Sequence, residues 1–353
     1  MAHLSNFEVF LLLSVLKVAV VLVITLMGVA YTVLLERKLL GRMQNRWGPS
    51  RVGPFGLLQP LMDGAKLFLK EDMMPLAVER PLFILAPIIA LGCSLISVSM
   101  VPFGAVTRVQ GTDLFQIANV NIGLLVILGV TSIGVYGITL SGWSSNNKYS
   151  LLGSLRSTAQ MISYELALGL SLVGVVLRAQ SLNLRVIVES QSSRGILSWN
   201  IFGGCQIVAF FIYLIAAFAE TNRAPFDLPE AENELVAGYH TEYSSMKFAM
   251  FFMAEYANMI TVSCVATLLF LGGSTSVFGH LFDHFLNTPV ANAAFPVCWF
   301  VVKVFSFLAL YIWVRGTLPR FRYDQLMGFG WKFLLPLAMA NIIVTSLILA
   351  VRG

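Results

Sequence analysis

Eight apolar segments constrain what this chain of 353 residues can fold into more than any other feature of its sequence. A helix needs about 20 predominantly apolar residues to cross the hydrocarbon core of a bilayer. Since backbone groups in lipid must be paired within the spanning structure, segments of this length indicate helices. The sequence therefore predicts an all-α, polytopic membrane protein with about eight transmembrane helices. The expected spans are about 9–35, 82–102, 122–141, 161–177, 201–219, 248–271, 295–314 and 333–351.

Composition supports a membrane protein along the whole chain. Charged residues make up 12% of the sequence, about half the share in soluble domains, and the mean hydropathy is +0.80. The first apolar run, from about Val9 to Leu35, contains Lys17 and no small-residue cleavage site, so we expect a retained helix rather than a signal peptide. Without a repeat, a low-complexity tract or a soluble boundary, residues 1–353 are predicted to form a single transmembrane domain.

Lysine and arginine are distributed unevenly over the connections between the expected spans. Of the 23 basic residues, 16 lie in odd-numbered connections and 5 on the other side, while Lys17 and Lys303 lie within spans. The positive-inside rule then places both termini outside and the odd-numbered connections in the cytoplasm or matrix. Since no basic stripe is interleaved with aromatic residues, a nucleic-acid partner is not expected. Two inner connections, at 36–81 and 220–247, are expected to carry function.

Cysteine and histidine spacing gives no metal or cluster motif. His280 and His284 have helical i, i+4 spacing but no further ligand cluster nearby. The cysteines are isolated in or beside apolar segments, so we expect small buried side chains rather than zinc or iron–sulfur ligands. No metal ion or redox cofactor is therefore expected in this chain. The cysteines are Cys93, Cys205, Cys264 and Cys298.

The first inner connection has a helical pattern of its own. Apolar residues recur at three- and four-residue steps over 57–70, opposite a polar stripe that includes Gln59, Asp63 and Lys66. This pattern predicts an amphipathic helix, too short to span, along the membrane interface. Two Gly-Pro pairs in RWGPSRVGPFG (46–56) predict turns before it. Such a helix either forms an entrance for an amphipathic ligand or only anchors the loop.

Acidic residues are concentrated in one stretch of this apolar chain. Seven of the 18 carboxylates lie between residues 220 and 255, and Glu165 lies within another apolar span. Because an ionised carboxylate in a low-dielectric interior is costly, such acids must be solvated, paired or protonated. The stretch is therefore either a proton path or a solvated acidic loop. Its members are Glu220, Asp227, Glu230, Glu232, Glu234, Glu242 and Glu255.

Three motifs, in this order and in this membrane context, resemble the core membrane subunit of respiratory complex I, the NADH:quinone oxidoreductase. They are ERKLLGRMQNRWGP (36–49), GPFGLLQPLMDGAKLFLKED (53–72) and ETNRAPFDLPEAENELVAGYHTEYS (220–244). In that family the subunit is called H in bacteria and 1 in mitochondria, and the resemblance covers essentially the whole chain.

The resemblance implies that the substrate is quinone, which enters from the bilayer where the hydrophilic arm meets the membrane arm. Two peripheral-arm subunits are expected to close the chamber, and partner subunits are expected to hold FMN and the iron–sulfur clusters. Small membrane subunits are further expected neighbours, and a bacterial cytoplasmic membrane is the expected location.

Residue by residue, the resemblance implies two functional sets, one for quinone binding and one for proton transfer. Lys38 belongs to neither set, and we regard it as an inner-face anchor that follows the positive-inside bias. Positions that match the family's quinone chamber are Glu36, Arg37, Arg46, Asp63, Lys66, Arg223 and Phe226. Positions that match its lateral proton route are Glu165, Glu220, Asp227, Glu230, Glu232, Glu234, Glu242 and Glu255.

Two other functions remain open from the sequence. The equivalent subunit of a membrane-bound hydrogenase, or of a ferredoxin- or F420-dependent complex, shares the acidic loop, although the run NRAPFDLPE is closer to the quinone-reducing complexes. A stand-alone secondary transporter would bind ions directly through the acids, but such transporters usually show internal repeats, and none is visible here.

Overall fold

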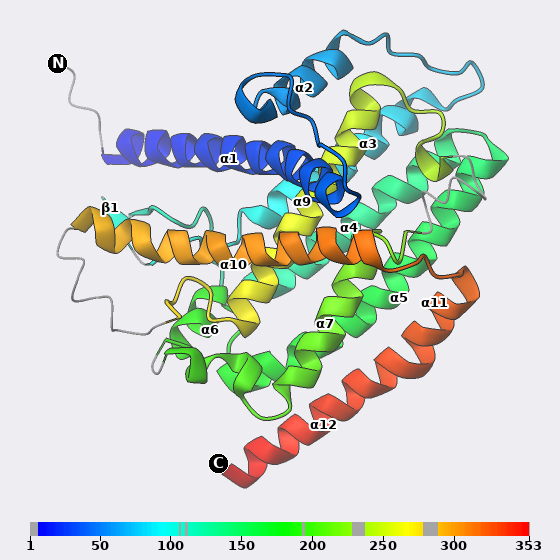
Figure 1. The fold of residues 1–353 in the computed structure, drawn as a ribbon. Helices are drawn as coiled ribbons and strands as arrows, with labels where there is room; N and C mark the ends of the chain where they lie inside the picture. The colour runs from blue at the N-terminus through cyan, green and yellow to red at the C-terminus, as the bar shows by residue number, and fades with distance from the viewer. Residues whose placement is uncertain are drawn as a thin grey trace, which may run out of the picture.

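The structure is a computed structural model that describes residues 6–105, 107–109, 112–192, 195–227, 237–277 and 289–352. Within these ranges nearly all regular structure is helical (Figure 1). The strands are the two-residue β1 (Arg108–Val109) and β2 (Thr112–Asp113), which pair antiparallel. The prediction of an all-α polytopic membrane protein is confirmed.

Seven helices of the described ranges are long and apolar enough to cross a membrane, and α7 is a shorter apolar helix of 15 residues. Together they match the eight expected spans. Helix α11 continues through a π-helical turn, η6, into α12, and these three form one span. The bounds are α1 (Asn6–Met43), α3 (Arg80–Val98), α4 (Gly123–Ser144), α5 (Lys148–Ala179), α7 (Gln206–Glu220), α9 (Ser245–Phe270), α10 (Pro289–Thr317), α11 (Tyr323–Phe329), η6 (Gly330–Leu334) and α12 (Leu335–Arg352).

The remaining elements are short and lie in the connections. Helix α2 has no buried residue and rests beside α1 and the start of α9, as expected for the amphipathic helix predicted at 57–70. The bounds are η1 (Pro54–Gly56), α2 (Gln59–Leu69), α6 (Leu184–Ser190), η2 (Gly195–Ser198), η3 (Asn200–Phe202) and η4 (Gly238–His240).

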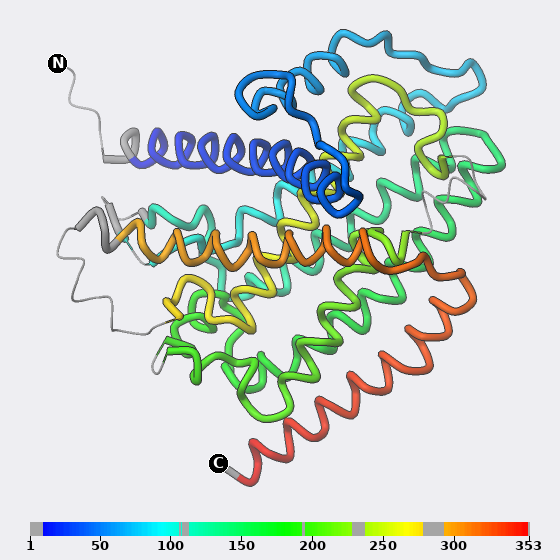
Figure 2. Tube along the Cα trace, in the orientation of Figure 1, coloured from blue at the N-terminus to red at the C-terminus, as the bar shows by residue number. Residues whose placement is uncertain are grey.

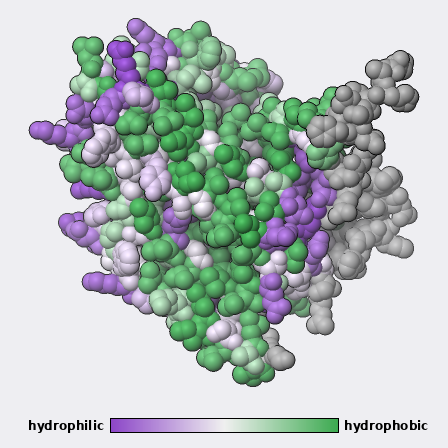
Figure 3. Space-filling model, turned by 180° about the vertical axis from the view of Figure 1, so that it is seen from behind, coloured by the Kyte–Doolittle hydropathy of each residue, from purple (hydrophilic) through white to green (hydrophobic). Residues whose placement is uncertain are grey.

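The start of α1 and the end of α12 lie on the same side of the helical bundle, as an even number of spans requires (Figure 2). We call it the terminal side; the β1–β2 pair and α6 are also there, while α2 and α11 lie toward the opposite side (Figure 1). Viewed from behind, a hydrophobic band separates two hydrophilic margins (Figure 3). Such a band is the surface that a protein exposes to lipid.

Helix α5 is at the centre of the packing, because α4, α7, α12 and η4 all contact it. Its approach to η4 depends on two glycines: a Cβ on Gly153 would come within 2.8 Å of the Gly238 Cα. Tyr164, Leu168 and Leu172, on one face of α5, are almost completely buried. The α5 face that carries Glu165 is thereby held against its neighbours.

Several helix bounds differ from the expected spans; α11, for example, begins ten residues before the expected start at 333. Helix α1 continues about eight residues beyond 35, so Glu36 and Arg37 are helical and the first connection starts later than residue 36. Charged residues such as Glu, Arg and Lys are good helix formers, and a hydropathy window detects only the apolar part. Helix α5 begins at Lys148 for the same reason, while α7 begins later than predicted, after the 3-10 turn η3.

The two lysines within spans are bound by backbone carbonyls. The Lys17 ammonium donates to the carbonyls of Asp113 and Gln116, both at 2.9 Å. Lys303 donates three hydrogen bonds of 2.7 to 2.9 Å to carbonyls in residues 271–275, after the end of α9, and lies 4.4 Å from the Trp199 ring centroid. Carbonyls at a helix C-terminus carry partial negative charge, so they stabilise an ammonium there.

The burial expected for the cysteines is correct for Cys93 and Cys264, whereas Cys205 is partly buried and Cys298 is exposed. The prediction was wrong for Cys298. This residue shares a face of α10 with the exposed Val301, Val302 and Phe305, so it belongs to the lipid-facing stripe.

Candidate functional site

A buried carboxylate, Glu36, collects three side chains from different elements. The Tyr256 hydroxyl donates to it at 2.7 Å from α9, and the Arg223 guanidinium reaches both carboxylate oxygens at 3.4 Å from the connection after α7. Arg315, near the end of α10, pairs with the other side of the carboxylate. The Arg223 guanidinium also lies over the Tyr256 ring, 4.0 Å from its centroid. Two expected quinone-site residues, Glu36 and Arg223, therefore meet in one ionic cluster.

A pocket of about 390 Å³ lies between α1, α2 and α9, beside this cluster. Its lining is mostly apolar, but it contains three expected quinone-site residues, Arg37, Asp63 and Lys66. Arg37 pairs with Asp63 at 2.7 Å, and both side chains are partly exposed. Phe252 connects the pocket to the cluster, because it lines the pocket and its ring centroid is 4.9 Å from that of Tyr256.

The other two expected quinone-site residues lie apart from this pocket. Phe226 is buried, with its ring centroid 5.9 Å from that of Tyr164 and 5.6 Å from that of Phe321. Arg46 is exposed, and its Nε donates to Gln44. The structure therefore does not bring the seven expected residues into one lining.

Two carboxylates face each other inside the bundle. Glu220 is the last residue of α7, and Glu165, on α5, is close enough for the two charges to repel. The Ser132 hydroxyl donates to Glu165 from α4, and Thr131 hydrogen-bonds Glu220. Three helices thus supply a pair of acids and two hydroxyls, the group types that hold and pass protons within a membrane.

The described acids of the following connection and of α9 that were expected in the proton route each have a partner. Asp227 is buried and accepts from Arg320 at 3.1 Å. Glu255 accepts from the Tyr239 hydroxyl at 2.9 Å, and Glu242 from the Asn147 side chain at 2.6 Å. Glu242 is thus held at the N-terminus of α5. Glu230, Glu232 and Glu234 lie outside the described residues.

One histidine in this region stays neutral near pH 7. His240, in η4, packs against the rings of Tyr239 and Phe248. Burial lowers the pKa of His240 from 6.5 to about 4, and the opposing charge of Asp227 only partly offsets this. Since Phe248 lines the pocket between α1, α2 and α9, an uncharged imidazole lies behind the pocket wall.

Four residues at the site were missed from the sequence. Tyr256 binds Glu36, and the segment after α10 provides Arg315, Arg320 and Phe321 as partners for the carboxylates and for Phe226. A signal was present, because the segment has several basic residues, but they were used only to predict topology.

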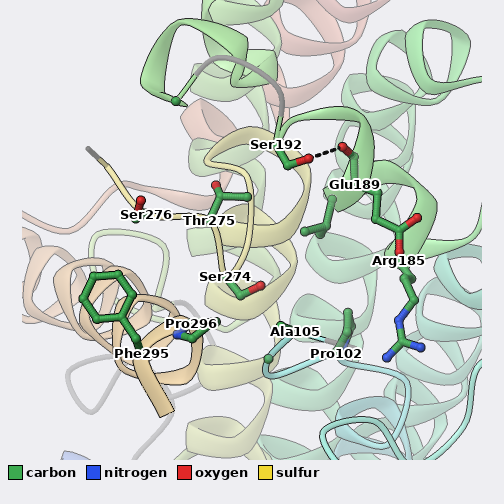
Figure 4. Close-up of a pocket in the computed structure, with 13 residues that line it drawn as sticks. Pro102, Ala105, Arg185, Glu189, Ser192, Ser274, Thr275, Ser276, Phe295 and Pro296 are labelled. Carbon is green, nitrogen blue, oxygen red and sulfur yellow. Dashed lines mark hydrogen bonds between the residues drawn. The ribbon is translucent and has the colours of Figure 1, made fainter. Parts of the chain in front are cut away.

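Two other cavities contain none of the expected site residues. One, of about 290 Å³ on the terminal side, is lined by polar side chains such as Glu189 and Ser274 (Figure 4). Its Arg185 pairs with Asp113 at 2.6 Å, and the Ser192 hydroxyl donates to the Glu189 carbonyl. The other is an apolar groove of about 720 Å³ along α1 and α10.

Side chains able to bind a metal ion do not cluster in the part of the chain that the structure describes. Within those ranges, no group of three or more His, Cys, Asp or Glu side chains is placed to hold a metal ion. His280 and His284 lie outside them.

Comparison with known proteins identifies the family. A model of the NADH dehydrogenase family matches residues 16–346. This chain belongs to that family. The resemblance carried by the three sequence motifs is therefore confirmed.

Relatives from the NADH dehydrogenase family cover almost the whole chain. The chain is 62% identical to the H 2 subunit of the NADH-quinone oxidoreductase of Koribacter versatilis, over 99% of this chain and all of that protein. It is 49% identical to the H 1 subunit from Solibacter usitatus, over 97% of this chain and 98% of that protein. The corresponding protein of Syntrophotalea carbinolica is also 49% identical, with the same coverage. The chain is thus a membrane subunit of an oxidoreductase complex.

Proposed function

We propose that this chain binds quinone in the pocket between α1, α2 and α9. The observation that carries the proposal is that this one pocket combines a mostly apolar lining with Arg37, Asp63 and Lys66. The apolar lining suits an isoprenoid tail, and a few polar groups would orient the headgroup. Arg stays protonated and presents a planar donor fork, so it stabilises a transiently anionic quinone.

The electrons come from partner subunits in this proposal. Two peripheral-arm subunits close the chamber, and one of them holds the iron–sulfur cluster that reduces the quinone. FMN is bound elsewhere in the assembly, and this chain binds no redox cofactor. Trp47, Phe55 and Leu76, which are exposed in the first connection, support a contact surface there because large apolar side chains favour a covering partner.

Quinone reduction is coupled to proton movement through the buried acids. The cluster of Glu36, Arg223 and Tyr256 lies beside the pocket, so a negative charge on the quinone would change the electrostatic interactions within it. Glu165 and Glu220 are close enough for their charges to repel each other, so a charge change at one alters the electrostatic field at the other. A charge change at the quinone would thus redistribute protons along the acids, toward neighbouring membrane subunits.

The location follows from the same proposal. The chain lies in a bacterial cytoplasmic membrane with its termini outside. The acidic connection after α7 faces inward, where the peripheral arm binds.

Asp63→Asn tests quinone binding in the assembled complex. Loss of the carboxylate frees Arg37 and removes a polar anchor, so kcat/KM for quinone should fall about tenfold or more. NADH oxidation by an artificial acceptor that bypasses quinone should remain unchanged. Asp324→Asn, on the exposed start of α11, is the matched control. Wild-type quinone kinetics in Asp63→Asn would contradict the proposed pocket.

Glu220→Gln and Glu165→Gln test the proton relay. Each removes a carboxylate from the interacting pair, so the number of protons pumped per electron in membrane vesicles should fall by about half or more. Glu189→Gln, on the terminal side, is the control. The relay assignment fails if both variants keep wild-type quinone reduction and proton pumping.

A further inference from the structure

A buried glutamine on α5 connects the end of α7 with the loop at residues 221–227, which we call the site loop. The Gln160 side chain is fully buried. Its amide nitrogen donates to the Ala219 carbonyl at 2.8 Å and to the Phe226 carbonyl at 2.7 Å. Both amide hydrogens are thus used, one on each end of the segment that contains Glu220 and Arg223.

The chemistry of these contacts is selective for an amide. Both partners are carbonyl oxygens, so the group facing them must offer two donors. A carboxylate would repel both carbonyls. An apolar side chain would remove the Gln160 hydrogen bond from the Phe226 carbonyl and would leave the Ala219 carbonyl with the longer bond of 3.3 Å from the Asn222 N–H. Ala219 lies in the last turn of α7, and its carbonyl also accepts from the Asn222 N–H at 3.3 Å, so the shorter Gln160 bond adds a side-chain cap to that turn.

The same face of α5 contacts the site loop a second time. Tyr164 lies one turn after Gln160, so the two side chains are neighbours on the helix surface. The Tyr164 ring centroid is 5.9 Å from that of Phe226, and the Tyr164 hydroxyl donates to the Leu326 carbonyl at 2.9 Å. Helix α5, which carries Glu165, therefore holds both the backbone and the ring of Phe226.

We propose that Gln160 is a positioning residue for the coupled reaction. It fixes Glu220 and the site loop relative to each other, so that a change at Arg223 on quinone reduction is transmitted to the pair of Glu220 and Glu165. This inference rests on the proposed function. It adds a residue that touches neither the quinone pocket nor a carboxylate side chain in the structure.

Two variants of the assembled complex test it. Gln160→Leu removes both hydrogen bonds, so kcat for quinone reduction and the protons pumped per electron should each fall about threefold or more. The KM for quinone should change less than about twofold, because the pocket between α1, α2 and α9 is intact. Gln160→Glu should also lower kcat and the proton stoichiometry relative to wild type, at both about pH 6 and about pH 9, because an ionised carboxyl repels the two carbonyls and a protonated one donates a single hydrogen bond.

Gln206→Leu is the matched control. Gln206 is also fully buried and donates to Thr345, but it lies at the start of α7, far along the helix from Glu220. Rates are expressed per assembled complex. A merely structural defect would therefore lower the amount of complex, but not kcat or the number of protons pumped per electron. Gln206→Leu should keep the wild-type kcat and proton stoichiometry.

The outcomes separate this inference from the proposed function. A wild-type kcat and stoichiometry in assembled Gln160→Leu overturns the positioning role. If that variant does not assemble, Gln160→Glu decides, and wild-type behaviour at both pH values overturns the role. Either result is compatible with the proposed quinone pocket if Asp63→Asn impairs quinone kinetics. Wild-type quinone kinetics in Asp63→Asn would contradict the pocket itself.

Discussion

At the scale of single residues, Glu36, on α1, is bound by two arginines from α10 and the connection after α7 and by a tyrosine hydroxyl from α9. Its carboxylate is 5% exposed and binds Arg223, Tyr256 and Arg315. Removing one partner of a buried ion pair leaves the other charge uncompensated, which costs about 3 to 5 kcal/mol. Most of that cost arises at Arg223, because its side chain is only 8% exposed.

Glu36→Gln should therefore lower the thermal stability of the assembled complex. The measurement is the rate of heat inactivation, with Glu71→Gln, an exposed acid near the end of α2, as the control. The double variant Glu36→Gln/Arg223→Leu should recover part of the loss, since it removes the unpaired charge as well. Equal inactivation rates for wild type and Glu36→Gln would show that the cluster contributes little to stability.

Glu36 and Arg223 were predictable from the sequence, whereas their shared contacts were not. Each lies in a motif with a recognisable family pattern. Tyr256 and Arg315 come from α9 and α10, and only packing brings them to a carboxylate up to 279 residues away. The position of Phe226 shows the same limit: its motif predicts the quinone chamber, but the ring packs between Tyr164 and Phe321.

At the scale of elements, α2 is held against α9 by polar contacts, among which those of Ser245 reach the helix itself. The Ser245 hydroxyl lies 2.9 Å from the Leu67 carbonyl and 2.8 Å from the Lys70 carbonyl, both at the C-terminal end of α2. A salt bridge of 2.9 Å between Lys247 and Asp72 adds a second attachment. Because no residue of α2 is buried, these polar contacts position one wall of the pocket.

Ser245→Ala should loosen that wall. We expect the KM for quinone to rise about three- to tenfold with kcat changed less than twofold, because substrate binding is lost rather than chemistry. Ser263→Ala is the control, since Ser263 is buried in the same helix but bonds only to its own backbone, at the Met259 carbonyl. Identical KM values for the two variants would show that α2 is held by other contacts.

Helix type and approximate position were predictable because apolar length and amphipathic spacing are local properties. The ends of the helices were less predictable. The charged last turns of α1, which include Glu36 and Arg42, continue that helix beyond its apolar run. The π-helical turn η6 inside the last span left no recognisable signal in the hydropathy pattern.

At the scale of the whole molecule, the two ends of the bundle carry different elements. Helix α2 and the end of α7 lie away from the terminal side, which carries α6 and the β1–β2 pair (Figure 1). The positive-inside rule predicts that the terminal side faces outward.

Thiol labelling tests this orientation. In a variant lacking Cys298, Leu197→Cys places a thiol at an 81% exposed position in η2, on the terminal side. A membrane-impermeant maleimide should label it in intact cells. Tyr149→Cys, at an exposed position near the start of α5, should be labelled only in inverted vesicles. If Leu197→Cys were labelled only in inverted vesicles, the orientation would be the reverse of the predicted one.

The long-range pairing of Glu36 has a consequence for how the chain is made. Residue 36 leaves the ribosome 187 residues before Arg223 and 279 residues before Arg315. During most of translation the first inserted helix therefore carries an acid without either of its cationic partners. A nascent chain that stops before the seventh span would keep this acid incompletely neutralised, so the first helix reaches its final electrostatic state only when the chain is almost complete.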